Sequence, residues 1–128
     1  MLPFTALLLA AAAPAAYCDN PETPAQEQAC AEAAFDRIEG DLNAQWQRTA
    51  DTMKARDREY QRDGEEGWFP VLLAAQRAWI DYREAHCLSA APRLRPRPDD
   101  HAIQMIICRN SMGLIRIEQL KELEEGMG

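Results

Sequence analysis

The chain has 128 residues, and its 21 acidic side chains outnumber its 14 basic ones, which gives a formal net charge of −7. This balance disfavours binding to nucleic acid or to anionic membranes, because their phosphates repel an acidic surface. Residues 17–128 suffice for one domain, although a domain of this size has only a thin core.

Residues 1–16, MLPFTALLLAAAAPAA, contain no charged side chain. Their apolar run is too short for a stable membrane anchor, and small residues that suit signal peptidase follow it. The pattern predicts a signal peptide over 1–16 and therefore a periplasmic or secreted protein. No Lys or Arg precedes the run, and the alternative is a buried N-terminal helix. Bulky Tyr17 argues against a lipoprotein anchored at Cys18.

The chain has four cysteines: Cys18, Cys30, Cys87 and Cys108. An even number in a small exported chain indicates disulfides, and four cysteines allow three pairings that the sequence does not distinguish. The local solution, Cys18–Cys30 and Cys87–Cys108, would close two short loops, and each bridge would contribute about 3 kcal/mol. A metal site is the alternative, but neither CxxC nor HxxxH occurs. We therefore expect no metal and no cofactor.

After an extended arm at 17–26, a long amphipathic helix is expected from about Glu27, because apolar residues recur every three or four positions over 35–60. The expected buried stripe consists of Phe35, Ile38, Leu42, Trp46, Thr49, Met53 and Tyr60. Gly40 within this helix indicates a close helix contact or a kink. The segment 63–67, DGEEG, ends the helix.

A second helix is expected to start between Trp68 and Pro70, with the proline in its first turn, and to end near Leu88. The segment 89–100 contains three prolines and three arginines and predicts a loop.

A third helix is expected from Asp99 or Asp100, which are good N-cap residues, to about Glu124. Its expected buried stripe consists of Ile103, Ile106, Ile107, Leu114, Ile117 and Leu120. No segment shows the alternation of a strand. The predicted fold class is therefore all-α, a small bundle of about three main helices stapled by two disulfides.

The second helix carries the densest set of polar and aromatic residues, in LLAAQRAWIDYREAHC. Asp81 and Glu84 are three residues apart, but exposed charge pairs at helical spacing explain them without catalysis. His86 and His101 are expected to be partly exposed residues beside a loop. Because no nucleophile stands with a base and no glycine-rich phosphate loop occurs, we expect no catalytic residue and no enzymatic activity.

The chain nevertheless resembles a family, the LprI-type lysozyme inhibitors. The family pattern has an early Cys, a second Cys about a dozen residues later, LN in the first helix, then L..AQ..W..YR...C, and a last Cys followed by Arg and Leu. The matching positions are Cys18, Cys30, Leu42, Asn43, Leu73, Ala75, Gln76, Trp79, Tyr82, Arg83, Cys87, Cys108, Arg116 and Leu120. The resemblance covers nearly all of residues 17–128. The chain departs from the family pattern at residues 93–100, RLRPRPDD, where members often carry a glycine- and serine-rich segment.

The resemblance implies an exported, helical, disulfide-bonded protein that binds a protein partner, and at least one member inhibits lysozyme. The alternative is an envelope interaction module with a non-lysozyme partner and no enzymatic activity. Four signature residues, Gln76, Trp79, Tyr82 and Arg83, are expected to hold the helices together. Trp79 and Tyr82 would bury their rings, and Gln76 and Arg83 would hydrogen-bond helix ends or the loop.

Charge is unevenly distributed along the chain, with thirteen acidic against six basic side chains in residues 19–66. Such an acidic region would attract a cationic lysozyme. Three loop arginines, Arg93, Arg95 and Arg97, are possible partner contacts that would address catalytic carboxylates in a cleft. A solvated loop without contacts is the alternative reading of these arginines.

Overall fold

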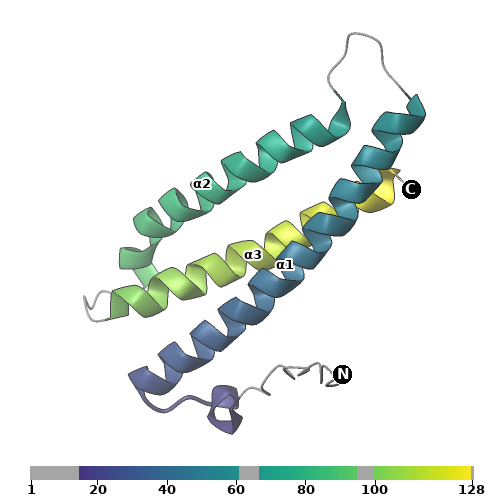
Figure 1. Ribbon diagram of the computed structural model, residues 1–128. Coiled ribbons are helices and arrows are strands. Elements are labelled where there is room, and N and C mark those ends of the chain that lie inside the picture. Colours follow the sequence, from purple (N-terminus) through teal and green to yellow (C-terminus); the bar gives the residue numbers. More distant parts are fainter. Residues whose placement is uncertain (1–14, 61–66, 95–99, 128) are drawn as a thin grey trace, which may run out of the picture.

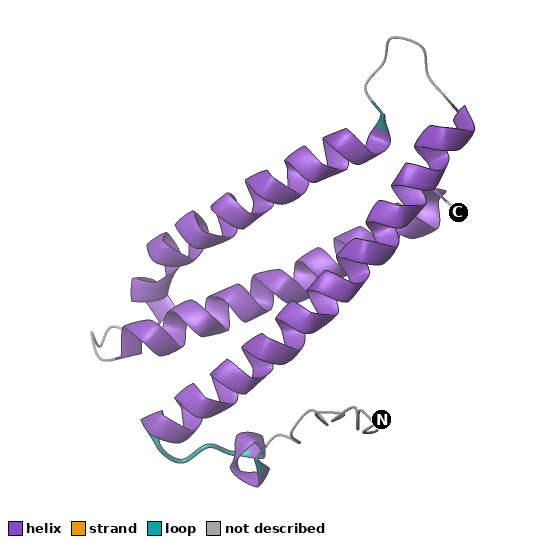
Figure 2. Cartoon of the chain, viewed as in Figure 1, coloured by secondary structure: helices purple, strands orange, loops and turns teal. Residues whose placement is uncertain are grey.

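The computed structural model describes residues 15–60, 67–94 and 100–127, with only the backbone described at 91–94 and 127. These parts of the chain form a short 3-10 helix, η1 (Ala16–Asp19), and three long helices, α1 (Pro24–Tyr60), α2 (Trp68–Leu94) and α3 (His101–Met127). No strand occurs within them, which confirms the all-α prediction (Figure 2). Helices α1 and α3 run in the same direction, and α2 runs opposite to both (Figure 1).

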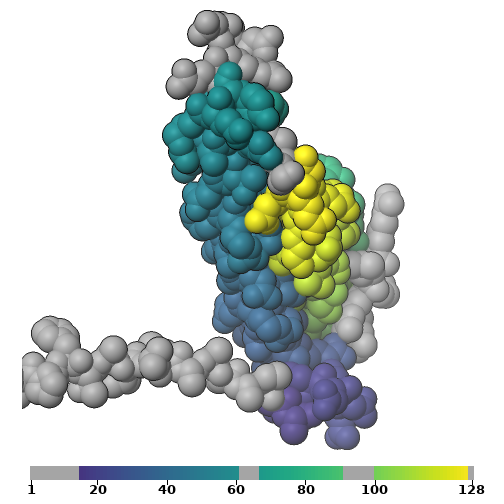
Figure 3. Space-filling view, turned by 90° about the vertical axis from the view of Figure 1, so that its right-hand side faces the viewer, coloured from purple at the N-terminus to yellow at the C-terminus, as the bar shows by residue number. Residues whose placement is uncertain are grey.

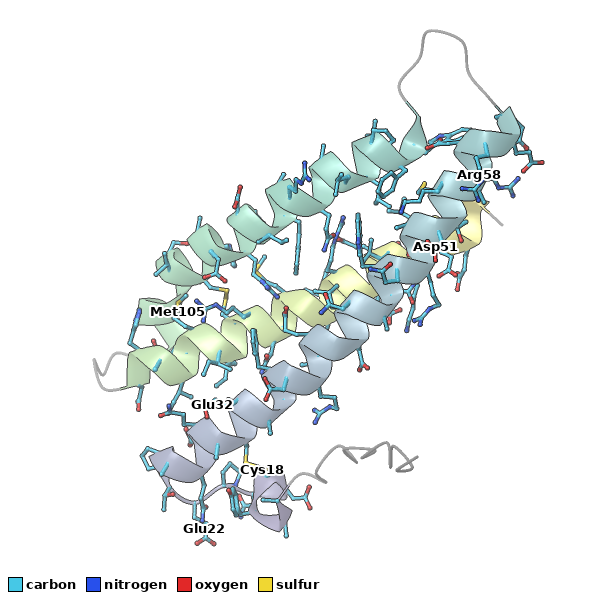
Figure 4. The ribbon with its side chains drawn as sticks, viewed as in Figure 1. Cys18, Glu22, Glu32, Asp51, Arg58 and Met105 are labelled. Atoms are coloured by element: carbon cyan, nitrogen blue, oxygen red, sulfur yellow. A yellow bond between two sulfur atoms is a disulfide. The ribbon has the colours of Figure 1, made fainter. Side chains whose placement is uncertain are left out.

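Helix α1 begins at Pro24, three residues earlier than predicted, because Thr23 caps it. The Thr23 hydroxyl accepts a hydrogen bond from the Gln26 backbone N–H at 3.1 Å, and proline suits the first helical position. The preceding arm is not fully extended as predicted, since Ala16–Asp19 forms one 3-10 turn. Cys18 ties this turn to the start of α1 (Figure 4).

The core lies along the seam between α1 and α3, which are side by side in both views (Figure 3). Its buried side chains are Ile38, Leu42, Met53, Leu72, Ile117 and Leu120. Thr49, fully buried, donates its hydroxyl to the Leu120 carbonyl at 3.0 Å. The helices approach closely at Gly113, where a Cβ would lie 2.9 Å from Ile38 Cγ2. The close contact considered for Gly40 is absent, since a Cβ there would meet no atom within 4 Å.

Helix α2 begins at Trp68, as predicted, and α1 supplies its cap. The Asp57 carboxylate accepts hydrogen bonds from the backbone N–H groups of Trp68, at 2.7 Å, and Phe69, at 3.0 Å. These N–H groups have no partner within their own helix, and a negative charge is favourable at a helix N-terminus. One α1 carboxylate therefore fixes where α2 starts.

The loop predicted over 89–100 is shorter than expected, because α2 continues to Leu94. Ser89–Ala91 are small and compatible with a helix, and Pro92 costs the helix one backbone hydrogen bond without ending it. Helix α3 follows Asp100, in agreement with the predicted start, and ends three residues beyond the predicted Glu124.

Three residues of the predicted buried stripes are exposed: Tyr60, Ile107 and Leu114. The buried face of α3 instead includes two polar residues, Gln104 and Arg116. The predicted stripe did not include these two, because periodicity identifies only apolar positions.

The disulfides follow the local pairing, Cys18–Cys30 and Cys87–Cys108. Cys87 and Cys108 form a second small core with Met105 and the half-buried Met112 between α2 and α3 (Figure 4). The proposed signal peptide falls almost wholly on residues 1–14, outside the described residues. None of the helices in the described ranges combines the length and apolarity needed to cross a bilayer.

Candidate functional site

Three of the four signature residues of α2, Gln76, Trp79 and Arg83, meet inside the bundle. The guanidinium carbon of Arg83 lies 4.7 Å from the centroid of the Trp79 ring, and that of Arg116, on α3, lies 5.9 Å from it. Both arginines are buried, with 7% and 9% of their surface exposed. Guanidinium groups over an indole gain a cation–π attraction that is stronger away from water. We call Glu39, Gln76, Trp79, Arg83 and Arg116 the signature cluster.

Hydrogen bonds join the signature cluster to all three helices. Arg116 donates through Nε to Gln76 Oε1 at 2.9 Å, and Arg83 forms an ion pair with Glu39 of α1. Gln76 and Arg83 therefore bond to side chains of neighbouring helices, not to helix ends or the loop as predicted.

The signature cluster contains two guanidinium groups and one carboxylate. Arg116 donates hydrogen bonds to two neutral acceptors, the side-chain oxygens of Gln76 and Gln119. Burial lowers the pKa of the Arg116 guanidinium. Within the described residues, Arg116 Nη2 and Arg83 Nε are buried without a hydrogen-bond partner. Buried charge is costly to leave unpaired, so the packing of this cluster is sensitive to the loss of any acceptor.

Tyr82 does not bury its ring as predicted, since 59% of its surface is exposed. Its ring lies against His86, one turn along α2, with 5.5 Å between the centroids. Tyr82 follows Trp79 by three residues, which places it about 60° around the helix axis from Trp79. The buried face of α2 therefore ends between these two residues. The signature is thus divided between an internal cluster and one surface aromatic.

Glu84 also departs from its predicted role as part of an exposed pair within α2. Its two carboxylate oxygens accept from Arg109 of α3, at 2.8 and 2.7 Å. The hydrogen bonds from Arg109 lower the pKa of Glu84, and the same pairing raises the pKa of Arg109. This bidentate pair is a second polar link between α2 and α3.

His86 and His101 are both exposed and lie on different helices, α2 and α3. No group of three or more His, Cys, Asp or Glu side chains suited to a metal ion occurs in the described ranges. The arginines considered as partner contacts are not placed: Arg95 and Arg97 lie outside the described residues, as does the side chain of Arg93.

A groove lies where the N-terminal part of α1 meets the middle of α3, with a cavity volume of about 390 Å³. We call it the α1–α3 groove. Its lining residues are Pro21, Glu27, Cys30, Ala31, Ala34, Ile107, Asn110, Ser111 and Leu114. Asn110 Nδ2 donates to the Ala31 carbonyl at 3.1 Å, while its buried Oδ1 has no donor among the described residues. The wall is mainly apolar, and it includes the two exposed α3 residues that periodicity predicted to be buried.

The chain around this groove is acidic. Residues 15–35 contain four acidic side chains and no basic one. Glu22 and Glu32 both lie at this end of the molecule (Figure 4). Sequence reasoning noted the acidic first half but missed the groove, because its members are 80 or so positions apart and the pattern placed Ile107 and Leu114 in the core.

These features define a class: a small all-α protein, stapled by two disulfides, with a polar internal cluster and an open apolar groove. A family model described as lysozyme inhibitor LprI matches residues 18–120. The chain therefore belongs to the LprI family of lysozyme inhibitors. Comparisons with curated proteins and with solved structures found no match.

Proposed function

We propose that this chain is exported and inhibits a lysozyme by binding to it as a folded protein. The observation that carries the proposal is the family match over residues 18–120. The matched range includes both disulfides, the whole signature cluster and every lining residue of the α1–α3 groove.

The charge of the chain supports a basic partner. Many lysozymes are strongly cationic, and a net charge of −7 would speed their encounter and favour the complex. This electrostatic contribution is screened by salt, so inhibition should weaken as ionic strength rises.

The stapled fold supports binding by a preorganised surface. A rigid protein loses less conformational entropy when it binds, and the disulfides hold the η1 turn on α1 and hold α2 on α3. Inhibition then results from steric exclusion of the cell-wall substrate, and it requires no catalytic group on this chain.

The test is a titration of the oxidised protein into chicken-type, goose-type and invertebrate-type lysozymes acting on cell-wall substrate. We expect stoichiometric inhibition of at least one type, and loss of inhibition after reduction and alkylation of the disulfides. If no lysozyme is inhibited, the proposal fails. Capture of one non-lysozyme partner from periplasmic extract would then favour an envelope interaction module.

A further inference from the structure

We propose that the α1–α3 groove binds a lysine or arginine side chain presented by a basic protein partner. Naming a lysozyme as that partner rests on the proposed function, whereas the chemistry of the bound side chain follows from the groove itself.

The apolar part of the groove suits the aliphatic stem of such a side chain. Leu114 is 52% exposed and Ile107 is 38% exposed, and both line the groove with Ala31 and Ala34. Large apolar side chains gathered at an exposed concave site are more informative than isolated ones. Lysine and arginine cover apolar surface with their methylene stems while the charged end stays polar.

The polar part of the groove suits a hydrogen-bond donor with positive charge. Glu27 lines the groove and contributes a carboxylate. A carboxylate accepts hydrogen bonds and carries negative charge, and lysine and arginine have donors only. An anionic or acceptor-only ligand would find no matching charge here.

The surroundings favour the same occupant. Residues 15–35 contain four acidic side chains and no basic one. The arginines of α3 do not supply positive charge to the groove, since Arg109 is paired with Glu84 of α2 and Arg116 is buried in the signature cluster. A volume of about 390 Å³ accommodates one long side chain and is at the small end for a drug-sized ligand.

Two neighbouring residues of α3 give a matched pair for the first test. Leu114 lines the groove, whereas Ile115 is similarly exposed, at 59%, and does not line it. Leu114→Lys and Ile115→Lys change the net charge equally, so long-range electrostatics cancel in their comparison. We expect Leu114→Lys to weaken lysozyme inhibition at least tenfold and Ile115→Lys less than twofold, with both melting like the parent. Equal effects of the two variants would overturn the proposal.

A second test does not depend on lysozyme. The oxidised protein, isotopically labelled, is titrated with hexylammonium and with hexanoate, which have the same stem and opposite charge, and NMR shifts are followed. We expect saturable shifts at Ala31, Asn110 and Leu114 with hexylammonium, and at least fivefold weaker binding of hexanoate. Shifts elsewhere on the protein, or equal binding of both probes, would overturn the proposal.

A pair of charge substitutions completes this test. Glu27→Gln should weaken hexylammonium binding at least threefold, while Asp36→Asn should not, since nine residues place it on the opposite side of α1. Failure of every lysozyme to respond to the parent protein would reject the proposed function alone. These titrations would still show whether the groove binds a cationic side chain.

Discussion

The signature cluster and the α1–α3 groove place polar and apolar groups in opposite ways. The signature cluster buries two guanidinium groups and a glutamine between helices, whereas the groove leaves leucine and isoleucine side chains at the surface. Buried polar groups and exposed apolar groups are the two departures from ordinary burial that call for an explanation. The first departure ties three helices together, and the second offers a surface to a partner.

This comparison predicts that variants of the two regions separate stability from binding. Changes in the signature cluster should lower the free energy of unfolding, and inhibition should fall only as the folded fraction falls. Substitutions of exposed groove residues such as Leu114 should leave the free energy of unfolding unaltered and weaken inhibition directly.

The largest expected effect distinguishes the two signature aromatics of α2. Trp79→Ala removes a ring that packs on the core and against both buried guanidinium groups, and should cost about 3 kcal/mol. Tyr82→Ala, at an exposed position, should stay within about 0.5 kcal/mol of the parent. Urea unfolding of both variants measures the difference. A Tyr82 variant as unstable as the Trp79 variant would show that both rings are structural.

The two disulfides should differ in what they support. The double variant Cys87→Ala/Cys108→Ala should cost about 3 kcal/mol, because it frees α2 from α3 inside a buried cluster. The double variant Cys18→Ala/Cys30→Ala should cost less, because it frees only the η1 turn. Since Cys30 and Pro21 line the groove, this second variant should weaken inhibition more than its stability loss explains.

Thermal unfolding and inhibition assays on the same samples check this pair. If inhibition follows the folded fraction equally in both double variants, the groove has no special link to the η1 turn.

A smaller effect comes from the bond between Gln76 and Arg116. Gln76→Leu leaves a buried guanidinium with one acceptor fewer and should cost about 2 kcal/mol. Adding Arg116→Met removes the stranded charge, and the double variant should recover at least half of that loss. A double-mutant cycle by chemical denaturation measures the coupling. Strictly additive costs would contradict the view that buried charge makes the signature cluster sensitive to the loss of an acceptor.

The smallest expected effect is the acid sensitivity of the Glu84–Arg109 pair. The pKa of Glu84 is lowered in the folded protein, so its contribution is present above its unfolded pKa of about 4.3 and is lost as pH falls through the folded value. Because the pair is partly exposed, we expect less than about 1 kcal/mol. Glu84→Gln should flatten the stability loss below about pH 5, and exposed Glu122→Gln serves as the control. Identical pH profiles for Glu84→Gln and the parent would contradict this assignment.

Much of the fold was accessible from the sequence because helical periodicity and capping residues are local signals. The start of α2 at Trp68, the start of α3 after Asp100 and the buried positions Ile38, Leu42 and Met53 follow from them. The sequence was less informative where a residue has a low helix propensity but the helix continues. Pro92 was expected to lie in a loop, yet α2 continues through it.

The candidate site was less predictable, because it depends on contacts between distant residues. No local pattern shows that Arg116 lies over the Trp79 ring, or that Leu114 faces solvent while Arg116 is buried. The pairing of Glu84 with Arg109 also spans two helices. Composition could identify an acidic first half, but only the folded chain brings Glu27 and Leu114 to one groove.

The most direct test of the account compares amide hydrogen exchange of the oxidised protein with and without a lysozyme that it inhibits. We expect added protection in residues 20–34 and 106–115, which border the α1–α3 groove, and little change on the outer face of α2 around Tyr82. Protection confined to α2 would contradict the account, since it would make the signature helix the binding surface and not the support of the fold.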